Sequence, residues 1–208
     1  MGLAPEGIKL LAGGAAATVL GAALCFWSKW AGLPLLVIGA AFTLFSAYFF
    51  RDPARDRVFA PAEIACPADG TVLSVGIEKD PEIMVVRIFL SILNVHIQRS
   101  PMDGKVESVA CTRGKFAVAY KPQARENARN RIAITGEQGR FAHVEQITGA
   151  IARRLAVYVK AGDSVKISDR LGMIYFGSQV AVYLPKNTRV LVKPGEKVYG
   201  AETVLGLW

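Results

Sequence analysis

Two long apolar segments open the chain, and short alternating segments follow them. No charged residue lies between Lys9 and Lys29, or between Lys29 and Arg51. Each gap has about the length that a helix needs to cross a hydrocarbon core of ~30 Å. The pattern therefore predicts helices over 10–28 and 30–50, which form a transmembrane or membrane-attached helical hairpin.

Two other interpretations of these segments compete with a membrane hairpin. A cleaved signal peptide fits poorly, because the first residues lack positive charge and a second apolar segment follows at once. A hydrophobic helix pair packed on a soluble domain stays open, since the small residues 13–17 favour close packing in either solvent. Arg51, Arg55 and Arg57 come next and favour a cytoplasmic side for the rest of the chain. We expect a hairpin and basic linker at 1–57 and a β-rich catalytic domain at 58–208.

The second part of the chain alternates in short segments separated by turns. Strands are predicted at 71–75, 83–95 and 104–111, with a hairpin formed by 131–135 and 141–147. The basic segment 113–131 is predicted to be a loop with a short helix. Residues 171–185 look like one buried strand, which would place the hydroxyl of Ser178 on an apolar face. A hydroxyl there costs stability unless it finds a partner.

A weak internal repeat bears on the fold. Lys160-Ala-Gly-Asp-Ser-Val165 returns as Lys193-Pro-Gly-Glu-Lys-Val198. These turns resemble those of biotinyl- and lipoyl-like β-sandwiches and barrel-sandwich hybrids, without the exposed Met-Lys or Asp-Lys pair on which such carriers are modified. We therefore expect a mainly β fold, a β-sandwich or barrel-sandwich-hybrid-like domain behind the helical hairpin, and no carrier role.

The net charge of +8 indicates that the chain binds an anionic partner. Residues 51–208 alone carry 23 Lys and Arg against 16 Asp and Glu. Nucleic acid and an anionic lipid surface both attract such a domain, and the apolar hairpin favours the lipid. We expect a membrane partner and no nucleic acid. The cysteines, Cys25, Cys66 and Cys111, have neither metal nor disulfide spacing, which indicates a reducing compartment and no metal site.

Three residues could supply nucleophilic chemistry: Ser178 as the nucleophile, His96 as the base and Asp69 as the orienting group. Such a triad must meet in space and has no fixed order in sequence. Each signal is weak alone, because His96 alternates with polar neighbours as surface histidines do, and Asp-Gly pairs such as Asp69-Gly70 are ordinary turns. His143 has no better claim.

Taken together, these motifs resemble the pyruvoyl-dependent phosphatidylserine decarboxylases, in their short bacterial and archaeal form. The resemblance runs over essentially the whole chain. It rests on Phe50–Pro53, Pro67–Gly70, Asn94–Pro101, Glu126–Asn130, Gln146–Arg154 and Gly172–Ser178. The chain departs from the family pattern at Leu93, where longer members carry a histidine. It also departs at Phe176, usually leucine, at Gln179, usually Thr or Ser, and at Ala128, usually glutamate.

The resemblance implies that Asp69, His96 and Ser178 are catalytic. It implies cleavage between Gly177 and Ser178 and a pyruvoyl cofactor derived from Ser178. The implied reaction converts phosphatidylserine, or an archaeal ether-lipid analogue, into the phosphatidylethanolamine-type lipid. The implied assembly is a heterodimer of the two cleavage products, with a higher homo-oligomer left open. The implied location is the cell membrane, with the catalytic domain on the cytoplasmic side.

The lipid phosphate would be held by basic residues, and a solvated loop facing anionic lipid is an equal alternative for each of them. The candidates are Arg113, Lys115, Lys121, Arg125, Arg129, Arg131, Arg153 and Arg154. Two other functions stay open. One is a non-enzymatic, membrane-anchored β-sandwich module that binds a partner through its basic face. The other is a pyruvoyl decarboxylase of a soluble amino acid, which the apolar hairpin argues against.

Overall fold

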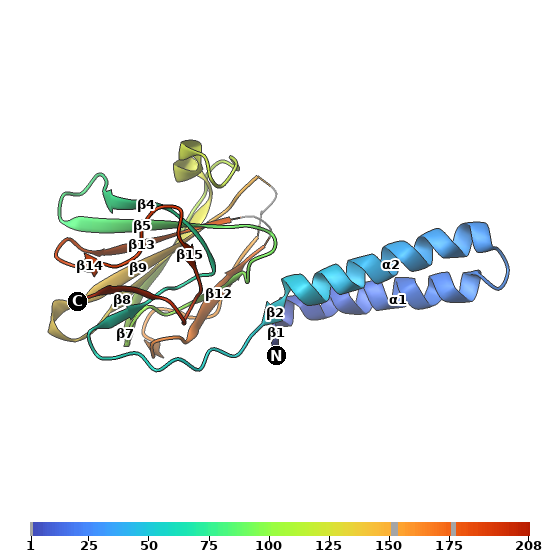
Figure 1. Ribbon diagram of the computed structural model, residues 1–208, viewed down its shortest axis with the longest axis horizontal. Coiled ribbons are helices and arrows are strands. Elements are labelled where there is room, and N and C mark those ends of the chain that lie inside the picture. Colours follow the sequence, from blue (N-terminus) through green and yellow to red (C-terminus); the bar gives the residue numbers. More distant parts are fainter. Residues whose placement is uncertain (1, 151–153, 176–177) are drawn as a thin grey trace. The chain divides into compact units, whose positions relative to one another are not determined.

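The computed structural model describes residues 2–150, 154–175 and 178–208, without the side chain of Pro122 (Figure 1). The chain forms two compact units, residues 1–54 and 55–208. The division lies in the same linker as the predicted one at residue 57. The chain is mainly β behind an N-terminal helix pair, which confirms the predicted fold class.

The first unit is a helical hairpin. A short 3₁₀ turn, η1 (Pro5–Gly7), leads into α1 (Ile8–Leu24), and α2 (Lys29–Phe49) follows. Strand β1 (Gly2–Leu3) pairs with β2 (Arg51–Asp52) at the open end. Both helices are long and apolar enough to cross a membrane.

Small residues explain why these two helices pack closely. Gly14 and Gly21 of α1 are buried, and so are Gly32, Gly39 and Ser46 of α2, at spacings of seven residues. A Cβ added at Gly21 would meet the backbone of Leu36 on the other helix. The contact therefore depends on the absence of side chains.

The second unit is built on an eight-stranded antiparallel sheet, in the order β11-β7-β8-β9-β13-β5-β4-β15. Its strands are β4 (Gly70–Ile77), β5 (Ile83–Leu90), β7 (Gly104–Thr112), β8 (Arg129–Thr135), β9 (Phe141–Ile147), β11 (Ser164–Val165), β13 (Ser178–Pro185) and β15 (Lys197–Val198). The hairpin of β8 and β9 confirms the one predicted about Gly136–Gly139, where the 3₁₀ turn η3 (Glu137–Gly139) lies. Another 3₁₀ turn, η2 (Pro122–Glu126), lies in the predicted basic loop.

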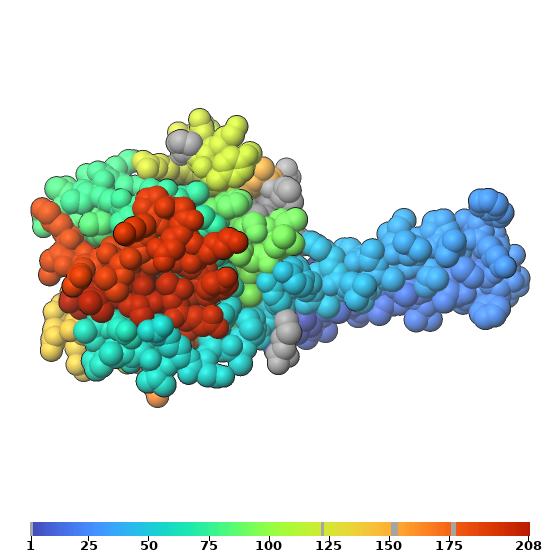
Figure 2. All heavy atoms as spheres, in the orientation of Figure 1, coloured from blue at the N-terminus to red at the C-terminus, as the bar shows by residue number. Residues whose placement is uncertain are grey.

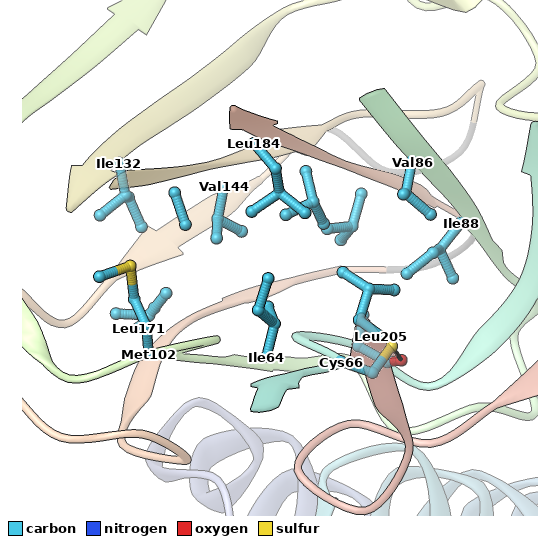
Figure 3. Close-up of a cluster of buried hydrophobic side chains, with 14 of the residues drawn as sticks. Ile64, Cys66, Val86, Ile88, Met102, Ile132, Val144, Leu171, Leu184 and Leu205 are labelled. Carbon is cyan, nitrogen blue, oxygen red and sulfur yellow. Dashed lines mark hydrogen bonds between the residues drawn. The ribbon is translucent and has the colours of Figure 1, made fainter. Parts of the chain in front are cut away.

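Two three-stranded sheets face the large one. They are β10 (Leu155–Val157), β12 (Arg170–Ile174) and β6 (Ile97–Arg99), and β14 (Arg189–Val190), β16 (Val204–Leu207) and β3 (Glu63–Ala65). Figure 3 shows side chains of the large sheet, such as Val144 and Leu184, pointing toward Ile64 and Leu205 from the small sheets. This apolar layer is the core of a β-sandwich.

The internal repeat occupies equivalent places in the sandwich. Gly162 donates its N–H to Val106 O at 2.8 Å, and Gly195 donates to Val72 O at the same distance. Both glycines have positive φ, of 96° and 87°, which favours glycine there. The strands that follow, β11 and β15, form the two edges of the large sheet. The repeated motif therefore builds two related halves.

Two expected strands are wrong in their extent. Residues 171–185 are two strands, because β12 ends at Ile174 in a small sheet and β13 begins at Ser178 in the large one. The segment 83–95 likewise ends as a strand at Leu90, where Asn94 Oδ1 accepts from the N–H of Ser91 at 2.9 Å. In both places the chain passes from one sheet to another while its apolar pattern continues.

Candidate functional site

Two connections between the sheets lie side by side and carry the predicted site. Strands β5 and β13 pair in the large sheet with Leu90 opposite Ser178, and β6 and β12 pair in a small sheet with Ile97 opposite Met173. Residues 91–96 and 175–178 therefore join the same two strand pairs. We call the described residues among them, 91–96, 175 and 178, the sheet crossing. Residues 176–177 lie outside the described residues. This crossing brings the backbone of His96 to the segment that ends at Ser178.

His96 is fully buried in the sheet crossing. Its carbonyl accepts the N–H of Ile174 at 3.1 Å, which fixes its backbone against the end of β12. Its Nδ1 lies 2.9 Å from Asn94 O. A carbonyl only accepts, so Nδ1 carries the hydrogen in this contact, and Nε2 keeps the lone pair that a base needs. The polar alternation around His96 is typical of a surface strand, but both faces of Val95–Gln98 are buried.

Ser178 is the first residue of β13 and is completely buried. Within the described part of the chain, its Oγ has no hydrogen-bond partner. Such an unsatisfied hydroxyl is destabilising, by about 1–3 kcal/mol. The predicted cleavage partner, Gly177, lies outside the described residues.

Asp69 lies in the turn before β4, beside the end of β5. A Cβ on the next residue, Gly70, would meet Phe89 O. The carboxylate of Asp69 accepts from Arg55 at 2.9 Å and from Gly200 N at 2.8 Å. Burial raises its pKa above the usual value, against the opposite effects of Arg55 and Gly200. In the structure, then, Asp69 is held by Arg55 and Gly200, and Nδ1 of His96 by Asn94.

A chain of buried amides supports the sheet crossing from inside the sandwich. Gln98 Nε2 donates to His96 O at 2.8 Å, and Gln98 Oε1 accepts from Gln146 Nε2 at 2.7 Å. Gln146 also donates to Ala156 O at 3.2 Å. Because these bonds join β6 to β9 across the core, they fix the backbone of His96 relative to the large sheet.

The candidate phosphate ligands do not gather at one place. Arg125, Arg129 and Arg131 line a cavity on the outer face of the large sheet. Lys115 pairs with Glu126 at 2.7 Å in solvent, and Arg113 and Lys121 are exposed. Arg154 lies beside the sheet crossing, with its guanidinium carbon 5.7 Å from the ring centroid of Tyr175. Arg153 lies outside the described residues.

Comparison with known proteins decides the family. The profile of the phosphatidylserine decarboxylase family matches residues 42–206. The chain is 44% identical to the phosphatidylserine decarboxylase proenzyme of Carboxydothermus hydrogenoformans, over 97% of this chain and 94% of that protein. This chain belongs to the phosphatidylserine decarboxylase family. It is also 38% identical to the proenzyme of that name from Neisseria gonorrhoeae, over 98% of this chain and 78% of the relative.

The phosphatidylserine decarboxylase match includes Asp69, His96 and Ser178 and omits most of the hairpin. Membership in this family of carboxy-lyases confirms the resemblance drawn from the motifs. The roles of the three residues, the cleavage site and the domain boundary stay predictions.

Sequence reasoning missed three residues of this phosphatidylserine decarboxylase family member: Gln98, Gln146 and Arg87. Arg87 is 6% exposed and is the sole charge in the apolar strand Ile83–Leu90. A charge in such a strand is a signal, because a buried guanidinium needs partners. The two glutamines lie within the motifs Asn94–Pro101 and Gln146–Arg154, but each stands between one apolar and one charged residue, as surface glutamines do, and nothing there marks them as buried.

Proposed function

We propose that this chain is a self-cleaving phosphatidylserine decarboxylase, in which Ser178 and His96 carry out the cleavage between Gly177 and Ser178. Family membership supports the reaction, and the relatives named as proenzymes support a cleaved precursor. The observation that carries the proposal is the sheet crossing. It holds the backbone of His96 against the end of β12, and the strand that follows begins with a buried serine hydroxyl that has no hydrogen-bond partner among the described residues.

The cleavage chemistry follows from the groups present. Nε2 of His96 takes the proton of the Ser178 hydroxyl, and Oγ attacks the carbonyl of Gly177. The C–N bond breaks, the α-amine of residue 178 takes the proton, and an ester joins the two pieces. A base then removes the Cα proton of residue 178, the bond between Cβ and Oγ breaks, and the carboxylate of residue 177 leaves. The dehydroalanine that remains takes a proton at Cβ and becomes an imine. Water replaces the nitrogen at residue 178, ammonia leaves, and residues 178–208 begin with a pyruvoyl group.

The residues present fit a pyruvoyl cofactor made from Ser178. Among the described residues, Ser178 Oγ has no hydrogen bond that would have to break before it attacks. A pyruvoyl carbonyl supplies the electron-withdrawing group that amino-acid decarboxylation requires. The buried amides Gln98 and Gln146 hold the surrounding backbone, and the side chains of His96 and Ser178 are themselves shielded from solvent. Arg154 is a basic candidate whose guanidinium lies beside the ring of Tyr175 in the sheet crossing.

The substrate class follows from the family and the hairpin. We propose a phospholipid with a phosphoserine head group, diacyl or ether-linked, reached at the membrane by α1 and α2. The arginines after α2 favour the cytoplasmic side for residues 55–208. The two cleavage products form the working heterodimer.

The test is the Ser178→Ala variant of the full chain. We expect wild-type protein to give a piece of about 3 kDa on denaturing electrophoresis and to decarboxylate phosphatidylserine, whereas Ser178→Ala stays whole and inactive. The physical reason is the loss of the attacking oxygen. Mass spectrometry of the small piece identifies its N-terminal group.

Thr188→Val is the matched control, because Thr188 Oγ1 is also buried without a partner among the described residues. Thr188→Val should cleave as wild type does. Wild-type protein that stays whole and inactive would favour the non-enzymatic binding module. Activity on free serine without lipid would favour a decarboxylase of a soluble amino acid.

A further inference from the structure

The large sheet has a cavity of about 310 Å³ on the face opposite the core. The register places Arg87, Ala181, Glu145 and Arg131 in one row across β5, β13, β9 and β8. Successive residues of a strand point to opposite faces. The hydroxyl of Ser178 lies on the face of Val180 and Val182, which belong to the core. We call this cavity the outer groove. It lies on the other face of the sheet from the Ser178 hydroxyl and is therefore separate from the cleavage site.

Basic side chains outnumber acidic ones in the outer groove. Its described lining contains the basic residues Lys79, Arg87, Arg125, Arg129 and Arg131 and the acidic residues Glu78, Asp80 and Glu145. Burial, together with Arg131, lowers the pKa of His143, so this imidazole adds no charge at neutral pH. The lining therefore has an excess of two positive charges.

Two of the carboxylates, the buried one of Glu145 and the partly buried one of Glu78, are already paired with part of this basic set. Glu78 accepts from Arg87 at 2.6 and 2.8 Å, and Glu145 accepts from Arg131 at 2.9 Å and from the Tyr183 hydroxyl at 2.8 Å. These pairs form a rigid floor for the outer groove. Because Glu78 and Glu145 are neutralised by Arg87 and Arg131, the other arginines of the groove can pair with a bound anion.

Arg125 and Arg129 are the arginines with donors to spare. Their side chains are 52% and 30% exposed. Arg125 reaches Glu78 at 3.1 Å. Arg129 donates from Nη1 to Arg125 O at 2.7 Å, while its Nε lies 3.6 Å from Glu145, beyond a good hydrogen bond. A guanidinium has five donors in a fixed fork that suits phosphate oxygens. Beneath them lie the apolar side chains of Val85 and Ile147.

We infer that the outer groove binds the phosphate group of a phosphate ester, with Arg125 and Arg129 as its principal ligands. A dianionic phosphate monoester balances the excess charge and a phosphodiester offsets half of it, while the apolar floor accommodates the organic part of the ester. The source is either the head group of an anionic phospholipid or a free phosphate ester. The inference does not depend on the proposed function, because the groove lies on the other face of the sheet.

The test measures binding to the full chain in detergent by calorimetry, with inorganic phosphate and glycerol phosphate as the probes. We expect both to bind and to raise the unfolding temperature, since a ligand of the folded state stabilises it. The double variant Arg125→Gln/Arg129→Gln should weaken binding about tenfold or more, because it removes charge-assisted hydrogen bonds. Its self-cleavage should match that of wild type and reports that it folds.

The matched control is Arg113→Gln/Lys121→Gln, which removes the same charge from the same segment outside the groove. It should bind the probes as wild type does. A second arm uses vesicles of phosphatidylcholine with or without phosphatidylglycerol. Binding in solution identifies a free ester as a ligand, whereas Arg125/Arg129-dependent binding confined to phosphatidylglycerol vesicles identifies a lipid head group.

Three results would overturn the inference. The first is that neither probe nor vesicle binds, which leaves the charges with a structural role only. The second is that both double variants weaken binding equally, since the effect would then be general electrostatic attraction. The third is that the Arg125→Gln/Arg129→Gln variant dissociates an oligomer, which would make this face an interface between copies of the chain.

Discussion

Asp69 and Asp103 occupy equivalent turns in the two halves of the repeat. Asp69 Oδ1 accepts from Gly200 N at 2.8 Å, and Asp103 Oδ1 accepts from Ile167 N at 2.6 Å. Part of what Asp69 does is therefore structural, as the sequence indicated for any Asp-Gly turn. Its distinguishing features are burial and the ion pair with Arg55 at 2.9 Å.

The pair of turns supplies a matched test of Asp69. We expect Asp69→Asn to slow self-cleavage about tenfold or more, equivalent to ~1.4 kcal/mol in the barrier. The reason is the role that the family resemblance implies for Asp69, in which its carboxylate stabilises the positive charge that His96 gains on taking the serine proton. Asp103→Asn should cleave at the wild-type rate, because its turn is exposed. The measurement is the rate at which the 178–208 piece appears.

Equal cleavage rates for both variants would mean that Asp69 acts only in its turn.

The pH dependence of the free energy of unfolding tests whether the carboxyl of Asp69 is buried as described. Its pKa is raised, so the folded state binds this proton more tightly than the unfolded state does. Wild type should thus gain stability relative to Asp69→Asn as the pH falls through the raised pKa, measured by urea unfolding.

At the scale of elements, local sequence patterns predicted the hairpins and turns but not the places where the chain passes from one sheet to another. The apolar hairpin, the β8–β9 hairpin and the repeated turns carry periodicity or turn residues that act over a few positions. The sheet crossing has no such signal, because alternation continues through Val95, His96 and Ile97 while the chain changes sheets. The outer groove was also hidden, since Arg87 and Arg131 meet only through the register of four strands.

The helix pair gives a prediction at this scale. Gly21→Leu should force α1 and α2 apart, because the added side chain would meet the backbone at Leu36. Overpacking of this kind costs about 1–3 kcal/mol. We expect a lower midpoint of thermal unfolding in detergent, followed by the helical circular dichroism signal.

Gly13→Leu is the control for Gly21→Leu, because a Cβ at Gly13 meets nothing within 4 Å. Both variants should still cleave themselves, since cleavage belongs to residues 55–208. A Gly21→Leu protein as stable as Gly13→Leu would refute the close helix contact.

At the scale of the whole molecule, the proposed cleavage would divide the chain at the start of β13, an interior strand of the large sheet. Residues 178–208 begin with β13, which lies between β9 and β5. They continue with β15, which pairs with β4, and β16, which pairs with β3. In Figure 2 these C-terminal residues, in red, lie between segments coloured cyan and green. The smaller product is thus interleaved with the larger one.

Cleaved protein should therefore behave as one particle until it is denatured. Val180, Val182, Leu184 and Leu205 are fully buried, and each contributes about 1.5–3 kcal/mol when it is removed from water. Their loss would expose the core of the larger piece as well. We expect both pieces in a single peak on size-exclusion chromatography in detergent, at the volume of uncleaved Ser178→Ala, and separate peaks only in guanidinium. Release of the small piece in native buffer, with the rest still folded, would contradict the central place of β13 in the sheet.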